Sequence, residues 1–452
     1  MHLNVFVMTT GHHEASWRLP ESDPYASIDL AHYQNVARIA EDAAFDSLFL
    51  ADSPHLPGPV RRRPWGMLEP LTLATALAAV TERIGLIATV STSYNEPYNV
   101  ARTLASLDHL SGGRFGWNVV TSPDLPAARN FGLSDLPSHA SRYARAAEFV
   151  EVAFKLWDSW ADDAIVGDKA AAIWADESKV CPIDHVGEYF SVAGPLNVPR
   201  PPQGHPLLVQ AGSSEEGRQF AGRYAEAVFT AQQTLPGARA FAEDLKARAA
   251  AFGRDPSKVK ILPGLVPIIG STTAEARALE ASLSELISQE YAQGQLASLL
   301  QVPVSALPLD GPLPFADLPP EESVEGARSR FSLVVDLARR ENLTVRQLIG
   351  RLGGGRGHLT ITGTPEQVAD EMEAWYSAGA ADGFNIMPAV LPSGLSVFCA
   401  EVVPLLRKRG LFRSEYAGRT LREHYGLDRP AVAVPAGNGD QRQPRLGSER
   451  LV

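Results

Sequence analysis

The sequence predicts a TIM (β/α)8 barrel, an α/β fold, and two observations support this prediction. Eight short segments rich in apolar and β-branched residues recur along the chain, and amphipathic segments with helical spacing separate most of them. Most of the eight are continuously apolar rather than alternating, as is typical of parallel strands buried on both faces. Repeated strand–helix units of this number predict a closed barrel surrounded by helices.

The predicted strands, in chain order, are residues 3–8, 47–52, 84–91, 114–122, 206–212, 227–231, 260–270 and 383–390. The stretches between them carry apolar residues at helical spacing, and several follow a Ser, Thr or Asp that can cap a helix. Gly112 and Gly113 predict a tight turn after a helix that ends at Leu110. We expect Arg114 to pair with a carboxylate at the bottom of the barrel.

Two connections between predicted elements are longer than a minimal barrel needs. Residues 161–205, rich in Pro and Gly, lie between the helix after strand four and strand five, and are expected to form a lid or a hairpin. Residues 271–358 are mostly helical and lie between strands seven and eight. We expect both insertions on the face that carries barrel active sites. Residues 1–430 then form a single domain, and residues 431–452 a flexible tail or a segment that packs on a neighbouring subunit.

Composition excludes several classes of protein. The net charge is −11, and the 41 basic residues form no stripe interleaved with aromatics, which argues against a nucleic-acid partner and for a small molecule. Cys181 and Cys399 are the two cysteines, too few for a disulfide framework or a four-cysteine zinc site, so a cytoplasmic location is expected. No basic and apolar leader and no long apolar stretch occurs, so neither secretion nor a membrane span is expected.

The segment SGGRFGWNVVTS, residues 111–122, ends an apolar strand on hydrogen-bonding side chains. Because the carboxyl ends of barrel strands face the active site, Asn118, Thr121 and Ser122 are predicted to lie there. Capping of the next turn explains Thr121 and Ser122 equally well. Asn118 lies inside the apolar run, where an unpaired amide costs about 1–3 kcal/mol, so it needs a partner, and a ligand is one candidate.

This segment also resembles the fourth strand of the bacterial luciferase-like FMN-dependent monooxygenases, in the branch of the nitrilotriacetate, EDTA and dibenzothiophene-sulfone monooxygenases. The resemblance extends to the blocks IATVSTSYNEPYNVARTLASLDHLSGGR, SHASRYARAAEFVEV, VQAGSSEEGRQFA and GFNIMP. It implies a two-component enzyme that receives reduced FMN from a separate NAD(P)H:FMN reductase. In the family, FMN activates dioxygen as a flavin C4a-(hydro)peroxide, which oxygenates a small organic substrate at a C–N, C–S or C–H bond. Homodimers or homotetramers are implied too.

The resemblance implies positions for the FMN. Asp52, Thr89 and Asn118 would lie along the isoalloxazine ring or ribityl chain, with a cis peptide near Ile87 and Ala88. His139 and Tyr143, four residues apart, would contact the flavin and its phosphate arm, and Ser213 and Ser214 at a helix start would cradle the phosphate. Structural alternatives remain for each: a turn cap at Asp52, an ordinary buried threonine at Thr89, a solvated His139, and a helix cap at Ser214 assisted by Glu216.

His12 and His13, in the loop after strand one, are the candidate catalytic residues, because an imidazole can titrate near neutral pH and hydrogen-bond an oxygen species. Solvation is the structural alternative. Trp17 and Trp65 are candidate apolar walls, and Arg61, Arg62 and Arg63 could attract a polycarboxylate or simply be solvated.

Other functions stay open from the sequence. A metal-dependent barrel hydrolase could use His12, His13, Asp52 and His55, although no HxH or HExxH spacing occurs and no metal is expected. An F420- or FMN-dependent oxidoreductase of the same superfamily, or a non-catalytic flavin-binding relative, would share the barrel. Neither a GxGxxG fingerprint that follows a strand nor a P-loop is present. The substrate is not predicted.

Overall fold

Eight parallel strands close into a barrel in the computed structural model, which describes residues 1–432 apart from 57, 59, 62, 63, 65–67, 325–327 and 356. Neighbours around the barrel follow the order β1, β2, β3, β4, β9, β10, β11 and β13, and β13 pairs with β1. All eight predicted strands are present. They are β1 (His2–Val7), β2 (Ser47–Leu50), β3 (Gly85–Ser91), β4 (Phe115–Val120), β9 (Leu207–Gln210), β10 (Ala227–Thr230), β11 (Lys260–Ile269) and β13 (Gly383–Ile386).

Side chains alternate between the interior of the barrel and the surrounding helices. In β4, Phe115, Trp117 and Val119 belong to the outer core that the helices cover. Gly116 and Asn118 have the opposite parity and therefore face the interior. The interior itself is filled by apolar residues from every side, including Phe6, Phe49, Ile87, Val209, Phe229 and Met387.

Helices surround the barrel, and most of them occupy the stretches in which the sequence shows helical spacing. They are α1 (Leu30–Asp42), α2 (Pro70–Ala78), α3 (Pro97–Ser111), α4 (Leu125–Asn130), α5 (His139–Trp157), α6 (Glu215–Tyr224), α7 (Leu235–Ala251), α12 (Pro365–Ser377), α13 (Ser393–Val397) and α14 (Val403–Lys408). Gly112 ends α3 in the left-handed conformation at φ 68°, and Gly113 follows at φ 88°, so the predicted glycine turn is confirmed.

Arg114 does not pair with a carboxylate, which corrects the prediction. Its buried guanidinium donates to the carbonyls of Ser111, Ala78, Thr81 and Ile84 and to the hydroxyl of Thr81. These groups lie at and beyond the C-terminal ends of α2 and α3, where carbonyls lack partners within the helix. The arginine therefore satisfies helix ends instead of an anion.

A ninth strand, β12 (Leu359–Gly363), was not predicted. It pairs in parallel with the second half of β11, from Leu265 to Ile269, beyond the part of β11 that pairs with β13. The ten-residue length of β11 leaves this half exposed along one edge, and β12 covers it.

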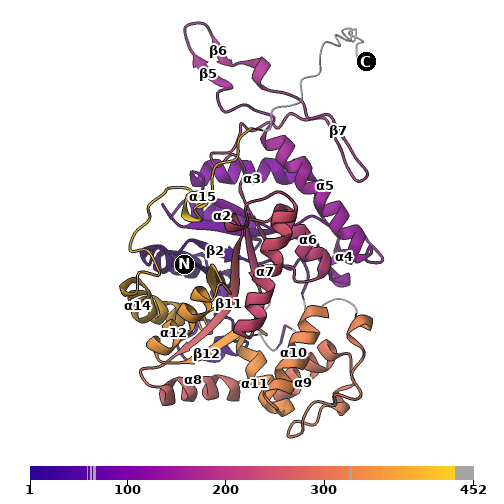
Figure 1. The fold of residues 1–452 in the computed structure, drawn as a ribbon, viewed down its shortest axis with the longest axis vertical. Helices are drawn as coiled ribbons and strands as arrows, with labels where there is room; N and C mark the ends of the chain where they lie inside the picture. Colours follow the sequence, from indigo (N-terminus) through magenta and orange to yellow (C-terminus); the bar gives the residue numbers. More distant parts are fainter. Residues whose placement is uncertain are drawn as a thin grey trace.

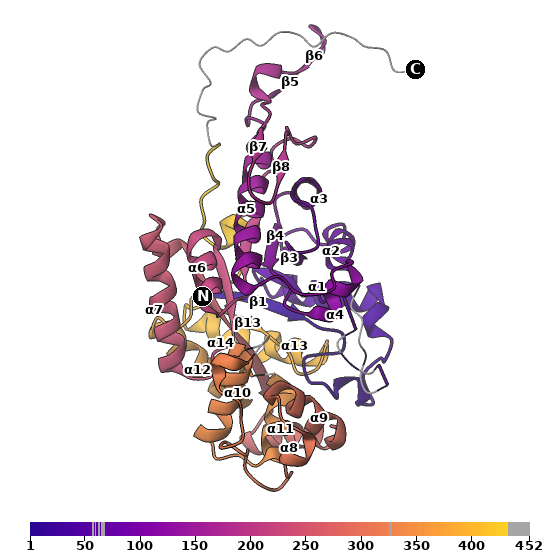
Figure 2. The same ribbon diagram turned by 90° about the vertical axis from the view of Figure 1, so that its right-hand side faces the viewer.

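The two insertions lie at opposite ends of the barrel, which corrects the expectation that both adjoin the active-site face (Figures 1 and 2). The first forms two hairpins, β5 (Ile165–Asp168) with β6 (Ile173–Ala175) and β7 (His185–Val186) with β8 (Ser191–Val192). It connects α5 to β9, a helix-to-strand connection, and such connections lie at the N-terminal ends of barrel strands. The second forms α8 (Thr273–Glu285), α9 (Gln289–Leu300), α10 (Arg328–Arg340) and α11 (Val345–Gly355) after β11, at the C-terminal end.

The C-terminal segment closes the N-terminal end of the barrel. In α15 (Leu421–His424), the fully buried Leu421 packs so tightly that a Cβ on Gly85 or Gly116 would lie 2.3 or 3.1 Å from its methyl groups. Tyr425 donates its hydroxyl to the side-chain oxygen of Asn4 at 2.8 Å. This end of the barrel is therefore plugged by side chains, and access to the interior is left to the other end.

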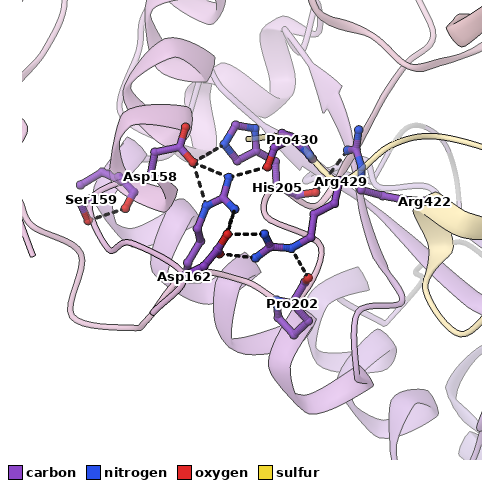
Figure 3. Close-up of polar contacts among 10 residues, drawn as sticks. Asp158, Ser159, Asp162, Pro202, His205, Arg422, Arg429 and Pro430 are labelled. Atoms are coloured by element: carbon purple, nitrogen blue, oxygen red, sulfur yellow. Dashed lines mark hydrogen bonds and ion pairs between the residues drawn. The ribbon is translucent and has the colours of Figure 1, made fainter. Parts of the chain in front are cut away.

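A network of charged groups fastens this segment to the first insertion (Figure 3). The buried Arg200 donates to Asp158 at 2.9 Å and to the carbonyl of Pro430 at 2.8 Å, and also reaches Asp162. Hydrogen bonds from Arg429, with Arg200 adding to them, hold the pKa of Asp162 at about 2.

Residues 433–452, most of the predicted tail, lie outside the described residues. Within the described residues no helix is both long and apolar enough to cross a bilayer.

Candidate functional site

Thr89 and Asn118 lie side by side on neighbouring strands at the C-terminal half of the barrel. The strand register pairs the two residues directly, and the Asn118 amide nitrogen donates to the Thr89 hydroxyl at 2.8 Å. Both are almost fully buried, and the Asn118 Oδ1 has no hydrogen-bond partner within the described chain. A buried acceptor left without a donor costs about 1–3 kcal/mol, so this oxygen marks a place where a ligand N–H or O–H would be stabilised.

Gln210, which ends β9, presents a second buried amide oxygen without a partner among the described residues. It sits opposite Val119 of β4, one residue along from Asn118. The sequence analysis missed Gln210, although the argument used for Asn118 applies to it, because it is a lone amide in the apolar run PLLVQAG.

Tyr143, Gly212 and Ser214 converge at the start of α6. A Cβ at Gly212 would lie 2.8 Å from the Tyr143 hydroxyl, and one at Gly217 would lie 3.0 Å from that hydroxyl and 3.1 Å from the Ser214 oxygen. Burial raises the pKa of the Tyr143 phenol, and interactions with Thr121 and Ser214 oppose the shift. The two glycines thus keep open a small polar space that side chains would fill.

His139 begins α5 and lies on the same face as Tyr143, as predicted, with ring centroids 4.9 Å apart. Its Nδ1 is 3.1 Å from a carboxylate oxygen of Glu216, and its Nε2 is 3.5 Å from the Ser214 hydroxyl. The side chain is 42% exposed, so His139 sits at the rim of this cluster rather than in its centre.

Ser214 caps α6 by accepting from the backbone N–H of Gly217 at 3.1 Å, while Ser213 precedes it half-buried. Glu216 pairs with His139 instead of completing a capping box. At the start of α6, the hydroxyls of Ser213 and Ser214, the phenol of Tyr143 and the imidazole of His139 thus lie near the free backbone N–H groups of the helix. Such hydrogen-bond donors suit a phosphate.

Asp52 does not join these residues. It follows β2 and is exposed to solvent. Partial desolvation by the surrounding protein raises the pKa of its carboxyl; a hydrogen bond from the Ser53 backbone opposes this shift, and the charge of Glu69 adds to it. The site residues thus come from β3, β4, α5 and the turn before α6, while Asp52 follows β2; they are Thr89, Asn118, His139, Tyr143, Ser213 and Ser214.

His12 and His13 are both almost fully buried rather than solvated. The His12 Nε2 donates to the Phe6 carbonyl at 2.9 Å, and its ring packs edge-on against the Phe6 ring in the barrel interior. The His13 Nδ1 accepts from the backbone N–H of Ala15 at 3.2 Å. Because the two rings engage different partners, the pair does not converge on one point, which also argues against a shared metal.

His358 was missed by the sequence analysis. It precedes the unpredicted strand β12 and stacks on Phe229 with ring centroids 5.1 Å apart. A Cβ at Gly264 would lie 2.4 Å from its Nδ1, so the ring reaches the barrel interior at a position that only a glycine permits. No local signal in the sequence pointed to it, since the contact depends on how the second insertion returns to the barrel.

The metal-hydrolase alternative finds no support in the described residues, where no three His, Cys, Asp or Glu side chains lie close enough to hold an ion. The His55 Nδ1 lies 3.2 Å from the Ser53 hydroxyl. Trp65, Arg62 and Arg63 fall outside the described residues. The described residues contain cis peptides at Pro195 and Pro392, so the cis peptide expected near Ile87 and Ala88 is wrong.

The model of the family "luciferase-like monooxygenase" matches residues 3–382, most of the chain. The chain belongs to the luciferase-like monooxygenase family. It is therefore an oxidoreductase, as the sequence resemblance implied.

Curated luciferase-like relatives match along nearly the whole chain. N-acetyl-S-(2-succino)cysteine monooxygenase of Bacillus subtilis is 48% identical over 95% of this chain and 97% of its own. Nitrilotriacetate monooxygenase component A of Aminobacter aminovorans is 47% identical over 96% of this chain and 99% of its own. The branch that the sequence resembled is thus confirmed.

Solved structures agree with this assignment. The EDTA monooxygenase of Chelativorans sp. BNC1 is 38% identical with a TM-score of 0.79, covering 96% of this chain and all of that one. A riboflavin lyase solved with modified FMN and riboflavin is 33% identical with a TM-score of 0.83, over 95% of this chain and 97% of that one. An F420-dependent alcohol dehydrogenase, 16% identical with a TM-score of 0.56, shares the fold alone, so the F420 alternative is not favoured.

Proposed function

We propose that this luciferase-like monooxygenase binds reduced FMN at the C-terminal end of the barrel and oxygenates a small organic acid. The observation that carries the proposal is the buried Asn118 amide oxygen, which lacks a partner among the described residues; the polar space at Gly212, bordered by Gln210 and Tyr143, adds a second place for polar ligand groups. A ring system with N–H donors and a phosphate tail fits such a site.

The residues fall into two groups. Thr89 and Asn118 would hold the ring or ribityl chain, because the Asn118 amide nitrogen is already fixed by the Thr89 hydroxyl and its oxygen faces the interior ready to accept. Tyr143, Ser213, Ser214 and His139 would hold the phosphate at the start of α6, where the helix dipole also favours an anion. Asp52, at the rim beyond β2, would border the ring edge.

Bound reduced FMN supplies the two electrons with which one atom of dioxygen enters the substrate while the other leaves as water. The chain excludes bulk water by plugging the far end of the barrel with Leu421 and Tyr425. His13 would orient the substrate or exchange a proton at its Nε2, since its Nδ1 is occupied as an acceptor. His12 would help to hold the loop that carries His13 in place, through its bond to the Phe6 carbonyl.

The organic-acid class is supported by two relatives, which are named for N-acetyl-S-(2-succino)cysteine and nitrilotriacetate. A separate NAD(P)H:FMN reductase would supply reduced FMN by diffusion, and this part of the proposal is supported by a relative that is itself named as one component of a monooxygenase. Assembly into a homodimer or homotetramer in the cytoplasm completes the proposal.

The test combines the protein with FMN, NADH, a flavin reductase and a panel of organic acids under ¹⁸O₂. Mass spectrometry should find one ¹⁸O atom in the product of at least one acid, and no product when reductase or oxygen is omitted. Product formed without the reductase, or failure of the protein to bind FMN in equilibrium dialysis, would contradict the proposal.

A further inference from the structure

A cavity of about 220 Å³ lies outside the barrel interior, between the loop after β1 and the turn that joins α8 to α9. Its walls come from the two segments in almost equal share, with Arg61 of the loop after β2 beside them. The residues are Glu14, Ala15, Trp17, Arg18, Arg61, Leu286, Ile287, Ser288 and Tyr291.

The walls are rich in hydrogen-bond donors. Arg18 and Arg61 bring two guanidiniums, and Arg61 is exposed and held by no hydrogen bond or ion pair within the described chain. The indole N–H of Trp17 is buried and has no acceptor among the described residues. Glu14 is the single carboxylate of the lining, so the cavity carries a net positive charge on a chain whose net charge is −11.

Two helix ends contribute to the cavity. Arg18 donates to the carbonyl of Leu286, the residue that ends α8. Ser288 precedes α9 and makes no side-chain capping bond, so the positive end of this twelve-residue helix meets the cavity. Two guanidiniums, an indole donor and a helix start together form a donor set that suits carboxylate oxygens.

The cavity adjoins the candidate catalytic loop. Ala15, in its wall, donates its backbone N–H to His13, and a Cβ at Gly353 of α11 would touch both Ile287 of the wall and His13, at 2.4 and 3.6 Å. A molecule held in this cavity would therefore lie next to the segment that carries His13.

We infer that Arg18 and Arg61 form the carboxylate-binding part of the substrate site, and that the enzyme selects substrates that present a carboxylate to this guanidinium pair. This inference rests on the proposed function and adds to it the residues that recognise the acid. One carboxylate binds the guanidinium pair, so the remainder of the molecule extends past His13 toward the barrel interior. Because Arg18 donates to the carbonyl of Leu286, the C-terminal end of α8 helps to set where this guanidinium meets the carboxylate.

The experiment measures binding, not turnover, on the FMN-loaded protein. Isothermal titration calorimetry with propane-1,2,3-tricarboxylate and with succinate, and with the corresponding uncharged amides, compares the wild type with Arg18→Gln and Arg61→Gln. Arg38→Gln is the matched control, since Arg38 is an exposed arginine on α1 outside the cavity. FMN affinity and the melting temperature are measured for every variant.

Each of the two substitutions should weaken binding of the tricarboxylate about tenfold or more, because each removes a charge-assisted hydrogen bond, while the control and the FMN affinity stay unchanged. The amides should bind weakly to all variants. Equal binding of acid by wild type and Arg61→Gln, or absence of acid binding by a wild type that holds FMN, would overturn the inference and leave the proposed function intact. Failure of the wild type to hold FMN would overturn the proposed function itself. If Arg18→Gln does not fold, the exposed Arg61 decides.

Discussion

Asn118 gives its amide N–H to the hydroxyl of Thr89 across two neighbouring strands, and the amide oxygen of the same side chain has no partner within the described chain. A single hydrogen bond thus fixes which end of the amide a ligand meets. The unpartnered buried oxygen destabilises the ligand-free protein, and a ligand that donates a hydrogen bond to it removes this cost. Unsatisfied buried polar groups of this kind are often found at binding sites.

Asn118→Ala is expected to weaken FMN binding about tenfold while leaving the unfolding free energy of the FMN-free protein nearly unchanged, because loss of the bond to Thr89 is offset by removal of a buried acceptor that had no partner. Fluorescence titration and urea unfolding measure the two effects. Asn385→Ala is the matched control: Asn385 is another buried asparagine with an oxygen unpartnered within the described chain. It pairs with Asn4, near the plugged end, so its loss should spare FMN affinity. Equal effects of the two substitutions would contradict the assignment.

Ser213→Ala combined with Tyr143→Phe should weaken binding of FMN but not of riboflavin, which has the same ring system without the phosphate. Each lost charge-assisted bond to phosphate is worth about 1.5–3 kcal/mol, a tenfold loss or more. Equilibrium dialysis with the two flavins checks this. A parallel loss of affinity for both flavins would place these side chains at the ring instead.

His13→Gln should lower the yield of oxygenated product per NADH consumed while leaving FMN affinity within twofold, since the proposed function assigns His13 to the substrate and not to the flavin. The coupling ratio, measured by product and peroxide assays across pH 6 to 8, is the readout. His109→Gln serves as the control, because His109 is exposed at the end of α3 and bonds only the Pro199 carbonyl among the described residues. Unchanged coupling in His13→Gln would return this side chain to a packing role.

Asp108 should make the protein more stable as the pH falls from about 6 to about 4. Burial raises the pKa of this carboxyl to about 6, against an ordinary value of 3.8, although hydrogen bonds from Gln203 and Phe115 oppose the shift. In this window the folded protein holds a proton that the unfolded chain releases, so stability drops as the pH rises through it. Urea unfolding of wild type and Asp108→Asn should show a difference that changes by up to about 3 kcal/mol across the window. A pH-independent difference would refute this.

Leu421→Ala should lower the unfolding free energy by about 2–5 kcal/mol, the usual cost of truncating a leucine in a close-packed core. Leu421 is fully buried against Gly85 and Gly116 at the plugged end of the barrel. Leu110→Ala provides the comparison, because Leu110 is 67% exposed and should change stability by less than about 0.5 kcal/mol. Similar values for the two would mean that the plug contributes little to folding.

Much of the barrel could be predicted because its strands are continuously apolar, and burial on both faces leaves that pattern in the sequence. Strand β12 escaped prediction since its residues are only half-buried and its partner is the overhang of β11. The first insertion was expected at the wrong end of the barrel. It connects the helix α5 to the strand β9, and such connections lie at the N-terminal ends of the strands, away from the active-site face. Arg114 was mispredicted because its carbonyl partners belong to helix ends that are far apart in sequence.

The sequence by itself determined the barrel, its family and the importance of Asn118, because these depend on local periodicity and on the cost of a polar group within an apolar run. Only the tertiary structure decided that Gln210 meets Tyr143 beside Gly212, that His358 reaches the barrel interior at Gly264, that Leu421 closes the opposite end, and that Arg18 meets Arg61 at one cavity. These pairings join residues tens to hundreds of positions apart, and no spacing rule along a chain reports which of its distant segments will pack together.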